Sequence, residues 1–152
     1  MAYWSQQDLE GLLGVEEVRA IFDDDNDGVA DPAPLSLVQR MSDTAVDAAL
    51  ATEFPATYPL TNPPDVVVRA SLLFGKAYAY ARRPEYVKQY GSKPLEEAKA
   101  NLEQIVTARE YMTSALGTQI AQQPANVGGV AIDNANRLYV DAADGTQNSG
   151  DF

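Results

Sequence analysis

The sequence of 152 residues contains no cysteine and no histidine. Without cysteine there is no disulfide framework, no thiolate nucleophile and no cysteine-based zinc site. Without histidine the chain lacks the commonest general base and transition-metal ligand, and with them every Ser-His or Cys-His catalytic arrangement. These two absences exclude much of ordinary enzyme chemistry, and we expect a protein that is not an enzyme.

Long apolar runs and a targeting segment are also missing from the sequence. No apolar run approaches the ~18 residues that a membrane span needs. The first residues, Met1–Asp8, lack the basic and apolar regions of a signal peptide. We therefore expect a chain that contacts no membrane and that is made in a cytoplasm, where it acts or is assembled into something larger.

Positive charge is scarce, with 11 basic against 22 acidic residues and a formal net charge of -11. Residues 1–34 hold nine acidic residues and one basic residue, residues 35–116 hold nine of each, and residues 117–152 hold four and one. An acidic chain repels nucleic-acid phosphate and offers no basic footprint for binding it. The charge distribution argues against a nucleic-acid-binding protein.

The apolar residues predict an all-α fold, a small bundle of about four to five helices with an extended C-terminal arm. Short helices are expected over residues 8–13, 15–22 and 84–90, and a long one from Pro94 to about Leu116. In three segments the apolar residues recur every three or four positions, as on one face of a helix. The predicted inward faces are Leu35, Val38, Met41, Ala45, Ala49 and Thr52; Val66, Ala70, Leu73, Ala77 and Tyr80 or Ala81; and Leu95, Ala98, Leu102, Ile105 and Met112.

Residues 117–152 differ from this helical body, residues 1–116, and hold five of the ten glycines. Two β-like runs, 130–132 and 138–140, flank a turn-like segment and together predict a hairpin. A lone two-stranded hairpin is marginal in water, so its apolar side chains need a neighbour. We predict an extended C-terminal arm that binds a partner through Val130, Ile132, Leu138, Tyr139 and Val140.

An acidic loop over residues 23–31 carries the sharpest local motif. Asp23, Asp25 and Asp27 alternate, Gly28 permits a sharp turn, and Asp31 falls at the ninth position. Hard cations such as calcium are bound by oxygen ligands on alternate residues of a loop that bends around the ion. The full helix-loop-helix calcium motif also needs a bidentate Glu at position twelve, where this chain has Pro34. Two interpretations remain open: a calcium-like ion held by Asp23, Asp25, Asp27 and Asp31 that fixes the loop, and a plain solvated turn. We expect no required cofactor.

The segment 82–93 mixes basic and aromatic residues. Such a strip could bind nucleic acid, with tyrosines stacking on bases and basic side chains pairing with phosphates. Its shortness and the acidity of the chain favour a connection between helices or a basic patch that meets an acidic surface. Arg69, Arg82 and Arg83 could pair with the acidic N-terminal third of the same or the next subunit.

Three glutamates, Glu96, Glu103 and Glu110, recur every seven residues along the last predicted helix. Glycoside hydrolysis needs two carboxyl groups that flank a cleft, and a row along a helix does not provide that arrangement. The row is more typical of a solvated helix face.

The order of several short motifs resembles a known family. These motifs are Tyr3–Leu9, with an aromatic pair before a Ser-x-x-Asp-Leu helix start; the acidic turn Asp25–Asp31; the helix Asp43–Ala51; the connection Phe54–Leu60, with Phe-Pro and Tyr-Pro-Leu; and Pro64–Ala70, which opens an alanine- and tyrosine-rich helix. Together they resemble the small head–tail connector proteins (adaptor or head-completion proteins) of long-tailed bacteriophages, in particular the Mu-type branch. The resemblance covers roughly residues 2–116.

This resemblance implies a mostly helical protomer of a dodecameric ring in the neck of a virion. The ring would dock on the portal protein of the DNA-filled head, extend its channel toward the tail and meet a neck stopper or tail-terminator protein. Its C-terminal arm would reach toward the portal, and DNA would pass an acidic lumen without specific binding. Two alternatives are a calcium-loop-containing helical binding module not of viral origin and, more weakly, a carboxylate-based hydrolase.

Overall fold

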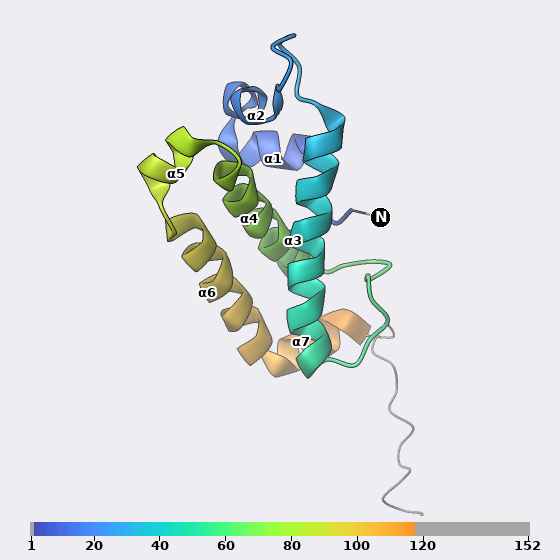
Figure 1. Cartoon of the computed structure of the whole chain (residues 1–152). Coiled ribbons are helices and arrows are strands. Elements are labelled where there is room, and N and C mark those ends of the chain that lie inside the picture. Colours follow the sequence, from blue (N-terminus) through green and yellow to red (C-terminus); the bar gives the residue numbers. More distant parts are fainter. Residues whose placement is uncertain (1, 118–152) are drawn as a thin grey trace, which may run out of the picture. The chain divides into compact units, whose positions relative to one another are not determined.

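The computed structural model describes residues 2–117, which form seven α-helices and no β-strand (Figure 1). The helices are α1 (Gln6–Leu13), α2 (Val15–Phe22), α3 (Pro32–Glu53), α4 (Asp65–Ala81), α5 (Pro84–Tyr90), α6 (Lys93–Thr107) and α7 (Arg109–Leu116). The predicted all-α character is confirmed for these residues, with more helices than the four to five expected. None of these helices combines the length and apolar character that a membrane span requires. The hairpin predicted for the arm lies outside the described residues.

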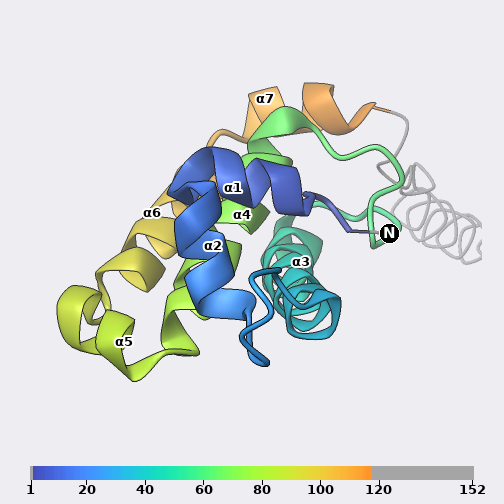
Figure 2. The same cartoon turned by 90° about the horizontal axis from the view of Figure 1, so that it is seen from above.

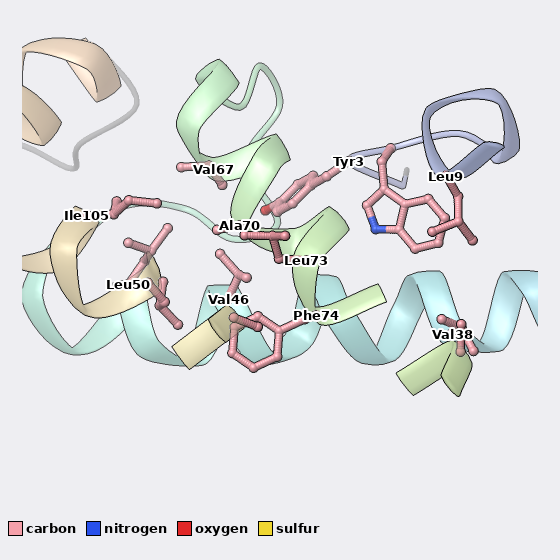
Figure 3. Packing of buried hydrophobic residues seen from close by; sticks show 14 of the residues in the cluster. Tyr3, Leu9, Val38, Val46, Leu50, Val67, Ala70, Leu73, Phe74 and Ile105 are labelled. Atoms are coloured by element: carbon pink, nitrogen blue, oxygen red, sulfur yellow. The ribbon is translucent and has the colours of Figure 1, made fainter. Parts of the chain in front are cut away.

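Helix α4 lies at the centre of the body. Helices α3 and α6 lie in front of it in Figure 1, and the view from above shows α1 behind it (Figure 2). Its sequence suits this position, because small residues such as Ala70, Gly75, Ala77 and Ala79 are all buried and allow neighbouring helices to approach closely. Figure 3 shows Leu73 and Phe74 of α4 in the same apolar cluster as Val46 of α3.

The N-terminal aromatic pair belongs to this core. Tyr3 and Trp4 are buried, and a Cβ atom added at Gly75 would lie 2.5 Å from Cζ2 of the Trp4 ring. The indole therefore occupies the space that a side chain at position 75 would need. Ser5 then begins α1 as a capping box with Asp8, which fixes the direction in which the chain leaves the core.

The buried face of α3 differs from the predicted one beyond its second turn. Leu35 and Val38 are buried as expected, but Met41 is 45 % exposed. Over the next turns the buried positions are Ser42, Asp43, Val46 and Leu50, while the predicted Ala45 and Ala49 are partly buried against the core and Thr52 is exposed. The centre of the buried face is shifted from the predicted one because two polar residues, Ser42 and Asp43, occupy buried positions and hydrogen-bond the N-terminal segment.

The predicted long helix over residues 94–116 is divided in two at Ala108. The backbone of Ala108 has φ -78° and ψ 55°, which is not helical, and α7 starts from it at an angle to α6 (Figure 1). The bend lets Met112 and Leu116 bury themselves, with 0 % and 1 % exposed. Arg109 also donates to the Glu53 carbonyl oxygen at 3.3 Å, which ties α7 to the end of α3. The free energy gained by burying these side chains exceeds the free energy of continuing the helix. The sequence itself has no glycine or proline at this point.

Replacement of Gly75 by alanine tests the packing of Trp4 on α4. The added Cβ would overlap the rigid indole, and overpacking of this kind costs about 1–3 kcal/mol of unfolding free energy. Gly11→Ala is the matched control, because α1 has nothing within 4 Å of a Cβ at that position, and the gain in helix propensity is about 0.5–1 kcal/mol. Urea denaturation of both variants measures the difference, and equal stability of the two would contradict the packing described here.

Candidate functional site

The acidic loop joins α2 to α3 and brings together three of the four predicted ion ligands. One carboxylate oxygen each of Asp23, Asp25 and Asp27 lies within 4.8 Å of the other two. The chain turns between them through Asn26 (φ 63°) and Gly28 (φ 85°), both in the left-handed region that asparagine and glycine tolerate best. The geometry thus gathers three hard oxygen donors at one place on the surface.

Asp31, the fourth predicted ligand, has a different role. Its Oδ2 accepts a hydrogen bond from the Asp24 N–H at 2.8 Å, and its own N–H donates to the Phe22 carbonyl at 3.0 Å. These bonds close the two ends of the loop on each other. Asp31 is therefore a loop-closing residue and does not belong to the group of three carboxylates.

The three grouped carboxylates also organise the loop backbone. Asp23 accepts the N–H groups of Asp27 at 3.1 Å and Gly28 at 2.9 Å, and Asp27 accepts the Val29 N–H at 2.8 Å. An ionised carboxylate has about four lone-pair sites, so these bonds leave acceptor capacity for a cation. A hydrogen bond from the Asp27 N–H lowers the pKa of Asp25, but the neighbouring aspartates and slight desolvation raise it by more, so its pKa lies above the usual value. The residues fit a hard cation, and mutual repulsion would fall if one were bound.

Two arginines hold the loop against the end of α4. Arg82 and Arg83 contact the two carboxylate oxygens of Asp24 at 2.7 and 2.8 Å. Both also donate to the Ile21 carbonyl, at 3.3 and 3.0 Å, so they satisfy a carbonyl in the last turn of α2. The predicted pairing of Arg82 and Arg83 with the acidic N-terminal third is confirmed, and it occurs within one chain.

The aromatic residues of the segment 82–93 are engaged as well. Tyr86 and Tyr90 stack on Tyr80, with ring centroids 5.1 and 4.7 Å apart. Burial raises the pKa of Tyr80 and so keeps its hydroxyl protonated. This segment therefore serves as a connection between helices, and its arginines and these rings are engaged in contacts within the chain.

A buried polar network joins the N-terminal segment to α3. The Tyr3 N–H donates to Asp43 at 3.1 Å, the Tyr3 hydroxyl donates to Asp47, and the same hydroxyl accepts the Leu60 N–H at 2.8 Å. Burial raises the pKa of Asp43, against hydrogen bonds from Ser71 and the Tyr3 N–H that lower it by less. Because the folded-state pKa is raised, ionised Asp43 costs folding free energy near neutral pH, and that cost disappears as the pH falls through the folded pKa.

Trp4 extends the same network. Its Nε1 donates to the Ser42 hydroxyl at 3.0 Å, and Gln39 donates back to the Trp4 carbonyl at 2.9 Å. Ser71 of α4 donates to Asp43, so the network, with Leu60, connects four separate segments of the chain. Sequence reasoning missed these buried polar residues, since nothing in the sequence distinguishes Ser42 and Asp43 from the exposed polar residues of α3.

Three open hollows lie along α3, α4, α5 and α6, and we refer to them together as the groove. A hollow of about 640 Å³ lies along α3, one of about 290 Å³ lies among α4, α5 and α6, and Tyr78 borders both. A third hollow of about 330 Å³ lies between Thr52 of α3 and Val106 of α6. The lining is mainly apolar, with Leu37, Met41 and Val87 exposed beside it. The groove was not predicted, although Met41 and Ala45, which line it, belong to the apolar face predicted for α3.

The remaining predicted site residues do not form a catalytic arrangement in the described part of the chain. Glu96, Glu103 and Glu110 are all exposed, as on a solvated face, and the bend at Ala108 places Glu110 on α7. The predicted partner-binding residues of the arm, 130–140, lie outside the described residues.

No family model matches this sequence, and no curated protein and no solved structure is significantly similar to it. The function must therefore be argued from the residues themselves.

Tyr3→Phe tests the buried network. The change leaves the Asp47 carboxylate and the Leu60 N–H without their partner, and an orphaned buried polar group costs about 1–3 kcal/mol. Tyr111→Phe removes the same atom from a side chain that is exposed on α7, where surface substitutions change stability by less than about 0.5 kcal/mol. Chemical denaturation compares the two, and a Tyr3→Phe protein as stable as the Tyr111→Phe protein would show that the network contributes nothing.

Proposed function

We propose that the chain is a structural adaptor of a phage neck, without enzymatic activity, that forms a ring on the portal, extends the DNA channel and joins head to tail. The observation that carries the proposal is that three of the motifs behind the resemblance contact one another. The aromatic pair Tyr3–Trp4 bonds to the helix motif Asp43–Ala51 and, through Leu60, to the Phe-Pro…Tyr-Pro-Leu connection. Motifs that form one packed unit are more informative than motifs that only share an order.

The core and the open groove of the molecule have different roles in this proposal. Apart from the exposed acidic turn, the motifs that carry the resemblance contribute residues to the core, whereas the groove is left open. A subunit of an assembly needs such unpartnered apolar surface, because a monomer rarely exposes a large apolar patch without a use for it. This division supports an interaction protein over a hydrolase, since most of the described carboxylates are bonded to the loop backbone, bonded in the core, paired with basic side chains or solvated.

The acidity of the chain supports the same proposal. A channel lined with carboxylates lets DNA pass, because repulsion replaces the counterion-releasing contacts that would hold it. The C-terminal arm, residues 117–152, would bind the portal through Val130, Ile132, Leu138, Tyr139 and Val140, with folding coupled to binding. The proposed location is the virion neck, and the partner on the tail side would be a neck stopper or tail-terminator protein.

Binding to the portal tests this function. The full chain, mixed with the portal protein encoded in the same genome, is expected to co-sediment with it and to form a ring visible by electron microscopy. Leu138→Asp should weaken this binding strongly, because it places a charge in a predicted apolar contact. Thr146→Asp adds the same charge outside the two apolar runs and should leave binding unchanged. A full chain that does not bind the portal would overturn the proposal.

Removal of residues 118–152 separates the arm from the body. The described helices end at Leu116, with Gly117 as C-cap. We expect the shortened chain to keep its helical circular dichroism and thermal unfolding but to lose portal binding. Loss of the helical signal on truncation would show instead that the arm belongs to the folding unit.

A second candidate function, a calcium-loop-containing binding module, is favoured by the grouping of Asp23, Asp25 and Asp27. We propose that a calcium-like ion binds there and fixes the loop, a role that is compatible with either function. These three residues would hold the ion, and its charge would offset the clustered carboxylates. No catalytic step is assigned to it.

Calcium is expected to stabilise the protein modestly. For a Kd on the order of 10⁻⁴ M, ~1 mM calcium adds roughly 1.4 kcal/mol to the free energy of unfolding, which raises Tm by a few degrees. Asp25→Asn should abolish this increment. Glu16→Gln, which removes an equal charge from an exposed helical site, should preserve it. A Tm that does not respond to calcium in the unsubstituted protein would leave the loop as a plain acidic turn.

A further inference from the structure

The corner between α1 and α2 presents an apolar knob in an acidic setting. Leu12 and Val15, on either side of Gly14, are 42 % and 43 % exposed. Glu10 and Glu16 flank them in sequence, and the segment 1–34 carries nine acidic residues against one basic residue. We name this feature, defined by Leu12 and Val15, the corner knob.

The groove has the complementary character. Leu37 and Met41 of α3 and Val87 of α5 are between 45 % and 48 % exposed, although they lie beside an apolar hollow. Tyr78 borders two hollows, and the charged residue among their lining residues is Arg40, in the hollow along α3; the exposed Lys88 adjoins Val87 in sequence. An apolar floor with basic neighbours suits an apolar group carried by an acidic surface.

We propose that the corner knob of one copy docks into the groove of the next copy, so that Leu12 and Val15 contact the surface formed by Met41, Tyr78 and Val87. This inference rests on the proposed ring and names its subunit interface. The groove is lined by residues of α3, α4, α5 and α6, whereas the corner knob belongs to α1 and α2. A contact between two different surfaces is heterologous, and heterologous contacts generate rings when the rotation closes.

Charge selects a second copy as the occupant. The corner knob brings the most acidic third of the chain, at a net -8 for residues 1–34, to the two hollows that Tyr78 borders, in whose lining Arg40 is the charged residue. Lys88 beside Val87 adds a second positive group near the same place. The pairing would bury exposed apolar side chains on both copies at once, which is the main driving force of association.

The absence of cysteine from the chain permits a direct test by disulfide trapping. Two full-length single-cysteine proteins, Leu12→Cys and Val87→Cys, are mixed at high concentration and oxidised, and the mixed dimer is measured by non-reducing electrophoresis. Val29→Cys replaces Leu12→Cys in the control, because Val29 is also exposed and also lies in the acidic third. Val15→Cys with Met41→Cys is an independent second pair, and circular dichroism confirms that each variant folds.

The proposal expects several-fold more mixed dimer from Leu12→Cys with Val87→Cys than from Val29→Cys with Val87→Cys, and the same excess for the second pair. Equal yields would show only general attraction between acidic and basic surfaces and would overturn the proposal. Excess self-dimers of Val87→Cys would also overturn it, because they would place two grooves face to face. Trapping that depends on residues 118–152 would identify the arm as the occupant instead.

This experiment can fail independently of the portal test. Portal binding without the specific mixed dimer would retain the adaptor function and reject this subunit interface. The specific mixed dimer without portal binding would retain head-to-tail assembly and reject the neck adaptor.

Discussion

The packing of the Trp4 indole on the bare backbone of Gly75 is the contact on which the rest of the body depends. It draws the N-terminal segment across α4, and that position lets Tyr3 reach Asp43, Asp47 and Leu60. Four separate stretches of the chain are thereby held together at one place, and the arrangement buries the Asp43 carboxylate. The hydrogen bonds that Asp43 accepts from Ser71 and from the Tyr3 N–H offset the free-energy cost of that burial. The buried polar groups specify which face of α3 turns inward, a choice that its apolar residues alone leave open.

The helices could be predicted from the sequence wherever a residue at a helix boundary itself determines that boundary. Prolines at the first turns of α3, α5 and α6 and glycines after α1, α5 and α7 mark most of the boundaries. The face of α3 could not be predicted, because an apolar pattern cannot show that Ser42 and Asp43 have partners forty residues away. The bend at Ala108 was equally hidden, since its cause is the burial of Met112 and Leu116 and not the residue at the bend.

In the candidate sites, too, features set by neighbouring residues could be predicted, and features set by contacts in the folded chain could not. The grouping of Asp23, Asp25 and Asp27 follows from alternation and a turn, so it was readable from the sequence. The role of Asp31 was not, because its bond to the Asp24 N–H depends on how the loop closes. The groove is a product of three helices and appears only when they are assembled. Interaction surfaces of this kind consist of residues that do not take part in the core, which is why their sequence signal is weak.

The arginine pair at the end of α4 has a mechanical consequence. Arg82 and Arg83 grip Asp24 in the acidic loop, and directly after them the chain enters α5, whose Val87 forms one wall of the groove. The acidic loop is therefore tied to the part of the chain from which α5 starts, and the two arginines that make these contacts immediately precede the helix that carries Val87.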